Sequence, residues 1–90
     1  MEKFLQKKNT LGSKLHKDTV LADVELGKYF SLNPVASDIW EILKKPVSKE
    51  EVVEKLYDTY EIDLEVCHHE VSRFINDMMD KGLVSKIPSK

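Results

Sequence analysis

Polar and apolar positions alternate along residues 19–32, and this period of two is typical of β-strands. Along residues 19–25 the side chains divide between two faces, one with Val20, Ala22 and Val24 and the other with Leu21, Asp23 and Glu25. In residues 29–32 one face carries Phe30 and Leu32, and the opposite face carries Tyr29 and Ser31. The intervening Leu26-Gly27-Lys28 favours a tight turn, because glycine can take a positive φ. We therefore expect an antiparallel hairpin over residues 19–32.

Helical spacing begins directly after this hairpin. Asn33 is a good N-cap residue, and Pro34 suits the first helical position, where no N–H is needed. We expect a first helix over residues 34–44, with an apolar stripe of Ala36, Ile39, Trp40 and Leu43. Pro46 stops this helix.

Two further helices are predicted in the second half of the chain. The motif Ser48-x-x-Glu51 is a capping box, and it opens a helix that ends near Tyr60. The expected apolar face of this helix comprises Val52, Val53, Leu56, Tyr57 and Tyr60. A longer helix is expected from Asp63 to Lys81, with Gly82 as its C-cap and a stripe of Leu64, Cys67, Val71, Phe74, Ile75 and Met78. A short extended tail follows, with Leu83, Val84 and Ile87 as its apolar residues.

The segment before the hairpin, residues 1–17, is polar and rich in lysine. Its charged residues are Glu2 and the five lysines Lys3, Lys7, Lys8, Lys14 and Lys17. Both a first strand and a mobile arm fit this composition, and the pattern does not choose between them. Because strands precede helices, the order indicates an α+β fold. We expect a winged-helix-like domain, in which an N-terminal antiparallel β-hairpin or three-stranded sheet is followed by three α-helices.

Length and composition restrict the function. Ninety residues, 41% hydrophobic and 33% charged, predict one globular domain whose small core leaves little room for a deep enzyme pocket. The net charge of −2 gives the chain as a whole no nucleic-acid signature. A single cysteine excludes an internal disulfide, and neither a signal peptide nor a membrane span is visible. We expect a cytoplasmic, soluble protein that is a monomer when free and does not bind a membrane.

The run Cys67-His68-His69 is the strongest candidate for chemistry. Consecutive helical residues point about 100° apart, so these three side chains cannot converge on one metal ion. A Cys-His nucleophilic pair fails for the same geometric reason. The three glycines lie in separate turns, so they cannot form a phosphate-binding loop. We therefore expect no catalytic residue, no metal and no cofactor.

A winged-helix DNA-binding protein is the alternative from another functional class. Its recognition helix should carry basic or amide side chains toward the groove and phosphates of DNA. The predicted third helix instead carries two basic residues, Arg73 and Lys81, against the acidic Asp63, Glu65, Glu70, Asp77 and Asp80. We therefore expect no nucleic-acid partner.

The strand at residues 29–32 offers a different kind of site. In a hairpin, one of its edges pairs with residues 20–25 and the other edge keeps free N–H and C=O groups. If the third helix packs nearby, the free edge and the helix make a groove in which an extended peptide can add as a strand. Acidic residues on the rim would favour a guest that carries lysine or arginine.

Motifs in the same order resemble those of the PqqD-like family. The first part of the resemblance is Val20-Leu21-Ala22-Asp23, Gly27-Lys28-Tyr29-Phe30-Ser31-Leu32-Asn33, Ile39-Trp40 and Leu43. The second part is Val52, Leu56, Tyr60, Ile62-Asp63, Val71, Phe74 and Gly82-Leu83-Val84. The resemblance covers residues 18–87, and residues 1–17 do not match strongly. Proteins of this family are recognition elements for ribosomally made, post-translationally modified peptides, and they bind the leader of a precursor peptide.

The resemblance implies where a leader would dock. It implies that the leader adds beside the strand Lys28, Tyr29, Phe30, Ser31 and Leu32. The implied helix wall consists of Cys67, Val71, Phe74, Ile75 and Met78, and the implied polar rim consists of Glu70, Arg73 and Asp77.

A free-standing recognition protein implies separate enzymes that receive the peptide. In lasso-peptide pathways these are a cysteine leader peptidase and an ATP-dependent macrolactam synthetase, which is the setting we expect. In the pyrroloquinoline quinone pathway the resembling protein works with a radical enzyme, and this setting is the alternative.

Overall fold

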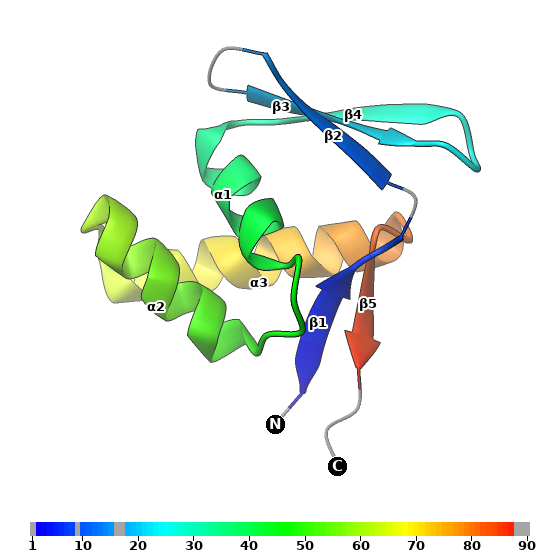
Figure 1. Cartoon of the computed structure of the whole chain (residues 1–90). Helices are drawn as coiled ribbons and strands as arrows, with labels where there is room; N and C mark the ends of the chain where they lie inside the picture. Colours follow the sequence, from blue (N-terminus) through cyan, green and yellow to red (C-terminus); the bar gives the residue numbers. More distant parts are fainter. Residues whose placement is uncertain (1, 9, 16–17, 88–90) are drawn as a thin grey trace.

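The computed structural model describes residues 2–8, 10–15 and 18–87 and shows an α+β architecture (Figure 1). Its elements in chain order are β1 (Lys3–Gln6), β2 (Thr10–Leu15), β3 (Asp18–Asp23), β4 (Lys28–Leu32), α1 (Pro34–Ile42), α2 (Lys49–Tyr60), α3 (Leu64–Asp80) and β5 (Val84–Ile87). Four strands precede three helices, so the expected fold class is confirmed. Among the described helices, none is long and apolar enough to cross a membrane.

The main sheet has the strand order β2-β3-β4, with both pairs antiparallel. The predicted hairpin is β3 and β4, and Gly27 has the expected positive φ of 65° in the connecting turn. The turn is longer than expected, because β3 ends at Asp23 and the carbonyl of Asp23 accepts a hydrogen bond from the Gly27 N–H at 2.8 Å. Val24 and Glu25, expected in the strand, therefore belong to the turn.

The lysine-rich N-terminal segment contains two strands, β1 and β2. β2 is the first strand of the main sheet, and β1 pairs antiparallel with β5 in a separate two-stranded sheet. Phe4 of β1 also pairs with Val47 in the connection between α1 and α2. The predicted extended tail is therefore a strand whose partner comes from the opposite end of the chain. Residues 1, 9, 16 and 17 of the predicted N-terminal segment lie outside the described part.

Local signals in the sequence fix the ends of the helices. Asn33 caps α1 by accepting a hydrogen bond from the Ala36 N–H at 2.8 Å, and Pro34 is the first helical residue. Ser48 and Glu51 form the predicted capping box at the start of α2. α3 ends at Asp80, and Gly82 takes a φ of 74° just beyond it.

The core lies between the helices and one face of the main sheet. From the sheet it takes Leu21 and Leu32, and from the helices it takes the predicted stripes around Ile39, Val52 and Val71. The faces of β3 thereby become distinct, because Leu21 is buried whereas Val20 and Ala22 lie on the outer face and are only half-buried. Two predicted core residues are exposed instead: Tyr57 and Leu64 lie at the margins of their helical stripes, where no other element covers them.

Candidate functional site

β4 forms one edge of the main sheet. Within the part of the chain that the structure describes, it pairs with β3 only. In an antiparallel strand, alternate residues direct their N–H and C=O groups away from the paired neighbour. β4 therefore presents backbone donors and acceptors at its outer edge.

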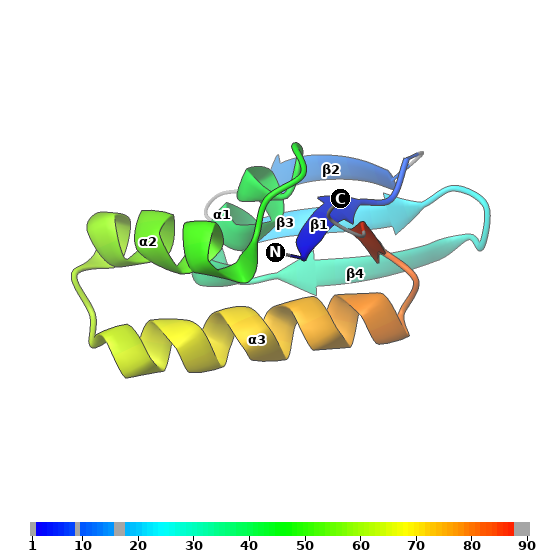
Figure 2. The same ribbon diagram turned by 90° about the horizontal axis from the view of Figure 1, so that it is seen from below.

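The axes of α3 and β4 are roughly aligned (Figure 2). Residues of both elements line a cavity of about 430 Å³. The cavity is lined by Tyr29, Phe30, Ser31, Leu32, Asn33, Ala36, Phe74, Asp77, Met78 and Lys81. One wall is thus the strand, and the other wall is the second half of the helix. Phe74 and Met78 contribute apolar side chains from the helix to its lining.

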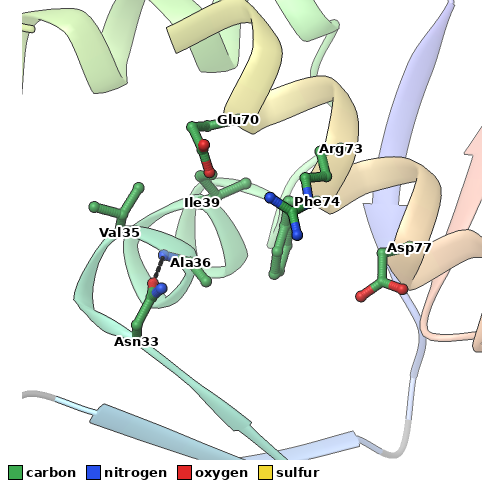
Figure 3. Close-up of a pocket in the computed structure, with 8 residues that line it drawn as sticks. All are labelled: Asn33, Val35, Ala36, Ile39, Glu70, Arg73, Phe74 and Asp77. Atoms are coloured by element: carbon green, nitrogen blue, oxygen red, sulfur yellow. Dashed lines mark hydrogen bonds between the residues drawn. The ribbon is translucent and has the colours of Figure 1, made fainter. Parts of the chain in front are cut away.

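A second cavity of about 360 Å³ continues the first toward the start of α1 (Figure 3). It is lined by Asn33, Val35, Ala36, Ile39, Glu70, Arg73, Phe74 and Asp77. Four of these residues, Asn33, Ala36, Phe74 and Asp77, also line the first cavity. The two cavities therefore form one continuous depression, called the β4–α3 groove below.

The junction of β4 with α1 closes one end of this groove. The Asn33 cap and Pro34 turn the chain directly from strand to helix. The Ser37 hydroxyl, buried in the first turn of α1, donates to the Leu32 carbonyl at 3.3 Å. These bonds hold the start of α1 against the end of the strand, so the apolar floor of the groove is fixed relative to the strand edge.

Charged side chains surround the apolar floor. Lys81 forms an ion pair with Asp77 at 2.7 Å, and its ammonium lies 5.9 Å from the centroid of the Phe30 ring. Lys81, the C-cap residue of α3, thus reaches toward Phe30 of β4 and offsets one acidic charge. Glu70 and Arg73 lie at the other end of the groove. The rim therefore combines both signs of charge instead of being uniformly acidic.

The structure gathers most of the predicted site residues around this groove. Those that line it are Tyr29, Phe30, Ser31, Leu32, Glu70, Arg73, Phe74, Asp77 and Met78. Lys28 begins the same strand and is exposed, although it does not line either cavity. The predicted strand and the third helix are therefore neighbours, as the groove hypothesis requires.

Three residues expected on the helix wall have a different place. Cys67, Val71 and Ile75 are completely buried and belong to the core. The surface of α3 that faces the groove is rotated from the predicted stripe and carries Glu70, Arg73, Phe74 and Asp77. The physical reason is the small size of the domain, because its core takes up the most apolar stripe of the helix.

Sequence reasoning missed part of the site. The residues that line the groove without having been expected there are Asn33, Val35, Ala36, Ile39 and Lys81. The sequence pattern predicts a helix cap at Asn33 and a core position at Ala36. Their direct position after β4 was the available signal, because a helix that starts at the end of an edge strand must adjoin that edge.

The residues of the Cys67-His68-His69 run do not line the groove. Cys67 faces the core, and burial raises the pKa of its thiol, with Asp63 nearby adding to the effect. His68 and His69 are exposed on α3. The arrangement keeps the Cys67 thiol protonated and packed as a small apolar side chain.

Two solved structures share this fold. One is the structure described as TbiB1 in complex with the TbiA(beta) leader peptide. Its matched chain is 23% identical to this one, with a TM-score of 0.80 over 90% of this chain and 94% of that chain. The other is lasso peptide synthetase B1 complexed with the leader peptide, at 21% identity, a TM-score of 0.77 and coverage of 94% and 98%. No curated protein sequence matches the chain significantly. The fold class is therefore that of these small α+β proteins.

The family follows from the sequence of the domain itself. The family model for coenzyme PQQ synthesis protein D (PqqD) matches residues 18–84, from β3 to the start of β5. The chain belongs to the PqqD family, which confirms the resemblance found in its motifs.

Proposed function

We propose that this protein binds the leader of a ribosomally made precursor peptide in lasso-peptide biosynthesis and delivers it to separate modifying enzymes. The observation that carries the proposal is the free edge of β4 beside an apolar groove. Both structural neighbours are complexes with a leader peptide, which supports the same use of this fold here.

The leader would bind as an additional antiparallel or parallel strand on β4. Its main chain would exchange hydrogen bonds with the outward N–H and C=O groups of residues 28–32, which gives affinity without dependence on sequence. Alternate side chains of the leader would enter the groove and contact Phe74, Met78 and Ala36. The mixed charges of Glu70, Arg73, Asp77 and Lys81 would then influence selectivity and the association rate.

Delivery requires a surface for a second protein, and the outer face of the main sheet is suited to it. Leu11, Ala22 and Tyr29 are direct cross-strand neighbours on that face. The exposed fractions of Leu11 and Tyr29 are 62% and 76%. A leader added to β4 would widen this sheet by one strand, so a partner enzyme could contact the carrier and its cargo on one surface. We propose a cysteine leader peptidase and a macrolactam synthetase as the partners.

The proposed contribution to the reaction is binding and not catalysis. Holding the leader beside an enzyme raises the local concentration of the core peptide at the active site. The family model favours one alternative, a PqqD-type chaperone that presents a peptide to a radical enzyme in cofactor or other peptide maturation. The neighbouring genes distinguish the two settings, because the enzymes of each pathway are encoded by different genes.

The test is a titration of the purified protein with a fluorescein-labelled synthetic leader from the neighbouring precursor gene. Phe74→Asp places a charge on the groove floor and should weaken binding at least tenfold, since about 1.4 kcal/mol corresponds to that factor. Asn76→Asp, on an exposed position of the same helix, is the matched control and should bind as tightly as wild type. Circular dichroism establishes that both variants are folded.

Amide chemical shifts locate the bound peptide. Shifts of residues 28–32 on addition of the leader support strand addition, whereas binding that leaves these amides unchanged contradicts it. Salt-dependent binding of duplex DNA, with no binding of the leader, would instead favour a DNA-binding function.

A further inference from the structure

Lys7 lies in the connection between β1 and β2 and contacts two distant parts of the chain. Its backbone N–H donates to the carbonyl of Leu83, just beyond α3, at 2.8 Å. Its ammonium lies 3.1 Å from a carboxylate oxygen of Asp23 and 3.5 Å from one of Glu25. A single residue therefore joins the C-terminal end of α3 to the turn that leads into β4.

Asp23 carries this contact into the turn. Its carboxylate is buried, and Oδ1 accepts hydrogen bonds from the backbone N–H groups of Glu25 at 3.1 Å and Leu26 at 3.3 Å. Burial by itself would raise the pKa of Asp23, but the hydrogen bonds from Lys7 and from the turn outweigh it and lower the pKa. The carboxylate is therefore charged at neutral pH, and it fixes the turn and the ammonium together.

Different contacts connect the two walls of the β4–α3 groove at its two ends. At the Asn33 end, the first turn of α1 lies between them and contributes Val35 and Ala36 to the floor. At the opposite end the walls carry Phe30 and Lys81, which face each other across the groove. Lys7 connects Asp23, the last residue of β3, to Leu83, which follows Lys81 and Gly82 at the end of α3.

We propose that Lys7 is a positioning residue that holds the β3–β4 hairpin at a fixed distance from α3, so that the groove is open to the required width before a peptide enters. This inference rests on the proposed function of the groove. A guest strand must form hydrogen bonds with β4 and contact α3 at the same time. A hairpin that moves away from α3 can therefore bind the peptide for only part of the time. The apparent dissociation constant is inversely proportional to the fraction of molecules in the competent state, so a fivefold loss of that fraction weakens binding fivefold.

Four variants test this role in the full chain. Lys7→Met removes the charge but keeps much of the stem, and Asp23→Asn removes the charge of the partner but keeps an oxygen for the turn. Each should weaken binding of the labelled leader about fivefold. Lys7→Arg retains a cation and should bind within about twofold of wild type. Lys8→Met, at the adjacent exposed position, is the matched control and should bind like wild type.

The double variant Lys7→Met with Asp23→Asn separates a shared role from two independent ones. If the two residues act as one pair, the double variant should bind no more weakly than the weaker single variant. Losses that multiply would contradict the proposal. All titrations are performed at a temperature at which circular dichroism shows every variant folded.

A second measurement examines the groove without any peptide. Nitroxide labels on Lys28→Cys and Asp80→Cys, both exposed, report the distance between the start of β4 and the end of α3. Double electron–electron resonance should give one narrow distribution of label-to-label distances for the wild-type background and for Lys7→Arg. Lys7→Met should give a broader distribution.

The outcomes are distinct. A Lys7→Met variant with a lower Tm but an unchanged dissociation constant and distance distribution would show a merely structural ion pair and overturn the inference. If the wild-type protein binds no leader, the proposed function fails, and the distance distribution of the free protein still decides whether Lys7 sets the spacing of the two elements.

Discussion

The hydroxyl of Tyr60 donates a hydrogen bond to the carboxylate of Asp38, and this bond ties the last turn of α2 to the middle of α1. Both residues are half-buried, so the bond lies at the margin of the core. It gives α2 a polar connection to the helix that adjoins β4, in addition to the apolar contacts of Val52, Val53 and Leu56.

We expect Tyr60→Phe to destabilise the protein by about 1 kcal/mol, the usual net contribution of such a bond. The hydrogen bond to Asp38, together with burial and the carboxylate charge, raises the pKa of Tyr60 above its ordinary value of 10.0. The contribution of Tyr60 is therefore fully present below pH 10 and is lost as the pH rises through the higher folded-state pKa. Urea unfolding between pH 8 and about 11.5, followed by Trp40 fluorescence, should show a smaller alkaline loss for Tyr60→Phe than for the control Tyr57→Phe.

The pair of Lys7 and Asp23 predicts how the free energy of unfolding changes at acid pH. The pKa of Asp23 is lowered below its ordinary value of 3.8, so its contribution is fully present above that pH and disappears as the pH falls through the lower folded-state value. Asp23→Asn should be less stable than wild type at pH 7, and the difference should shrink toward pH 2. Equal differences at both pH values would contradict a charged role for Asp23.

Two glycines predict opposite effects of the same substitution. At Gly12 an added Cβ would lie 3.5 Å from Leu21 Cδ2, an ordinary contact, and its φ is not positive. Gly12→Ala should therefore leave stability unchanged or increase it by up to about 1 kcal/mol, because the unfolded chain loses freedom. Gly82 has open space around it but a φ of 74°, so Gly82→Ala should cost about 1 kcal/mol. Thermal unfolding of the two variants measures the contrast.

The outer face of the main sheet predicts a separation of binding from delivery. Leu11 does not line the groove, and its side chain is largely exposed. Leu11→Lys should leave the fold and the dissociation constant of the leader unchanged, while it slows leader removal by the partner peptidase at least tenfold. A variant that is processed at the wild-type rate would show that the partner uses another face.

The features that the sequence predicted well are governed by neighbouring residues. Asn33 and Pro34 define a helix start by themselves, and Ser48 with Glu51 defines another. Gly82 ends α3 because glycine takes a positive φ there without strain. Alternation likewise predicted the pairing of β3 with β4, because a short turn leaves antiparallel pairing as the simple solution.

Features that depend on distant residues were not predictable to the same extent. The apolar stripe of α3 was identified, but how much of it the core would take depends on how closely α1, α2 and the sheet approach. In the folded protein Cys67, Val71 and Ile75 fill that core, and Phe74 remains for the groove. The pairing of β1 with β5 was also missed, because neither strand carries a signal that names its partner.

The β1–β5 pair places Lys3 opposite Ile87. The first described strand therefore cannot form its pair until the last one has been synthesised. Phe4 of β1 is buried, and its two pairing neighbours, Lys86 and Val47, lie far along the chain. During synthesis, β1 leaves the ribosome long before β5 exists. Contacts of such long range form slowly, because a large loop must close first. The nascent protein therefore leaves Phe4 without its β5 neighbour until β5 has been synthesised, even after Val47 is available to pair with it.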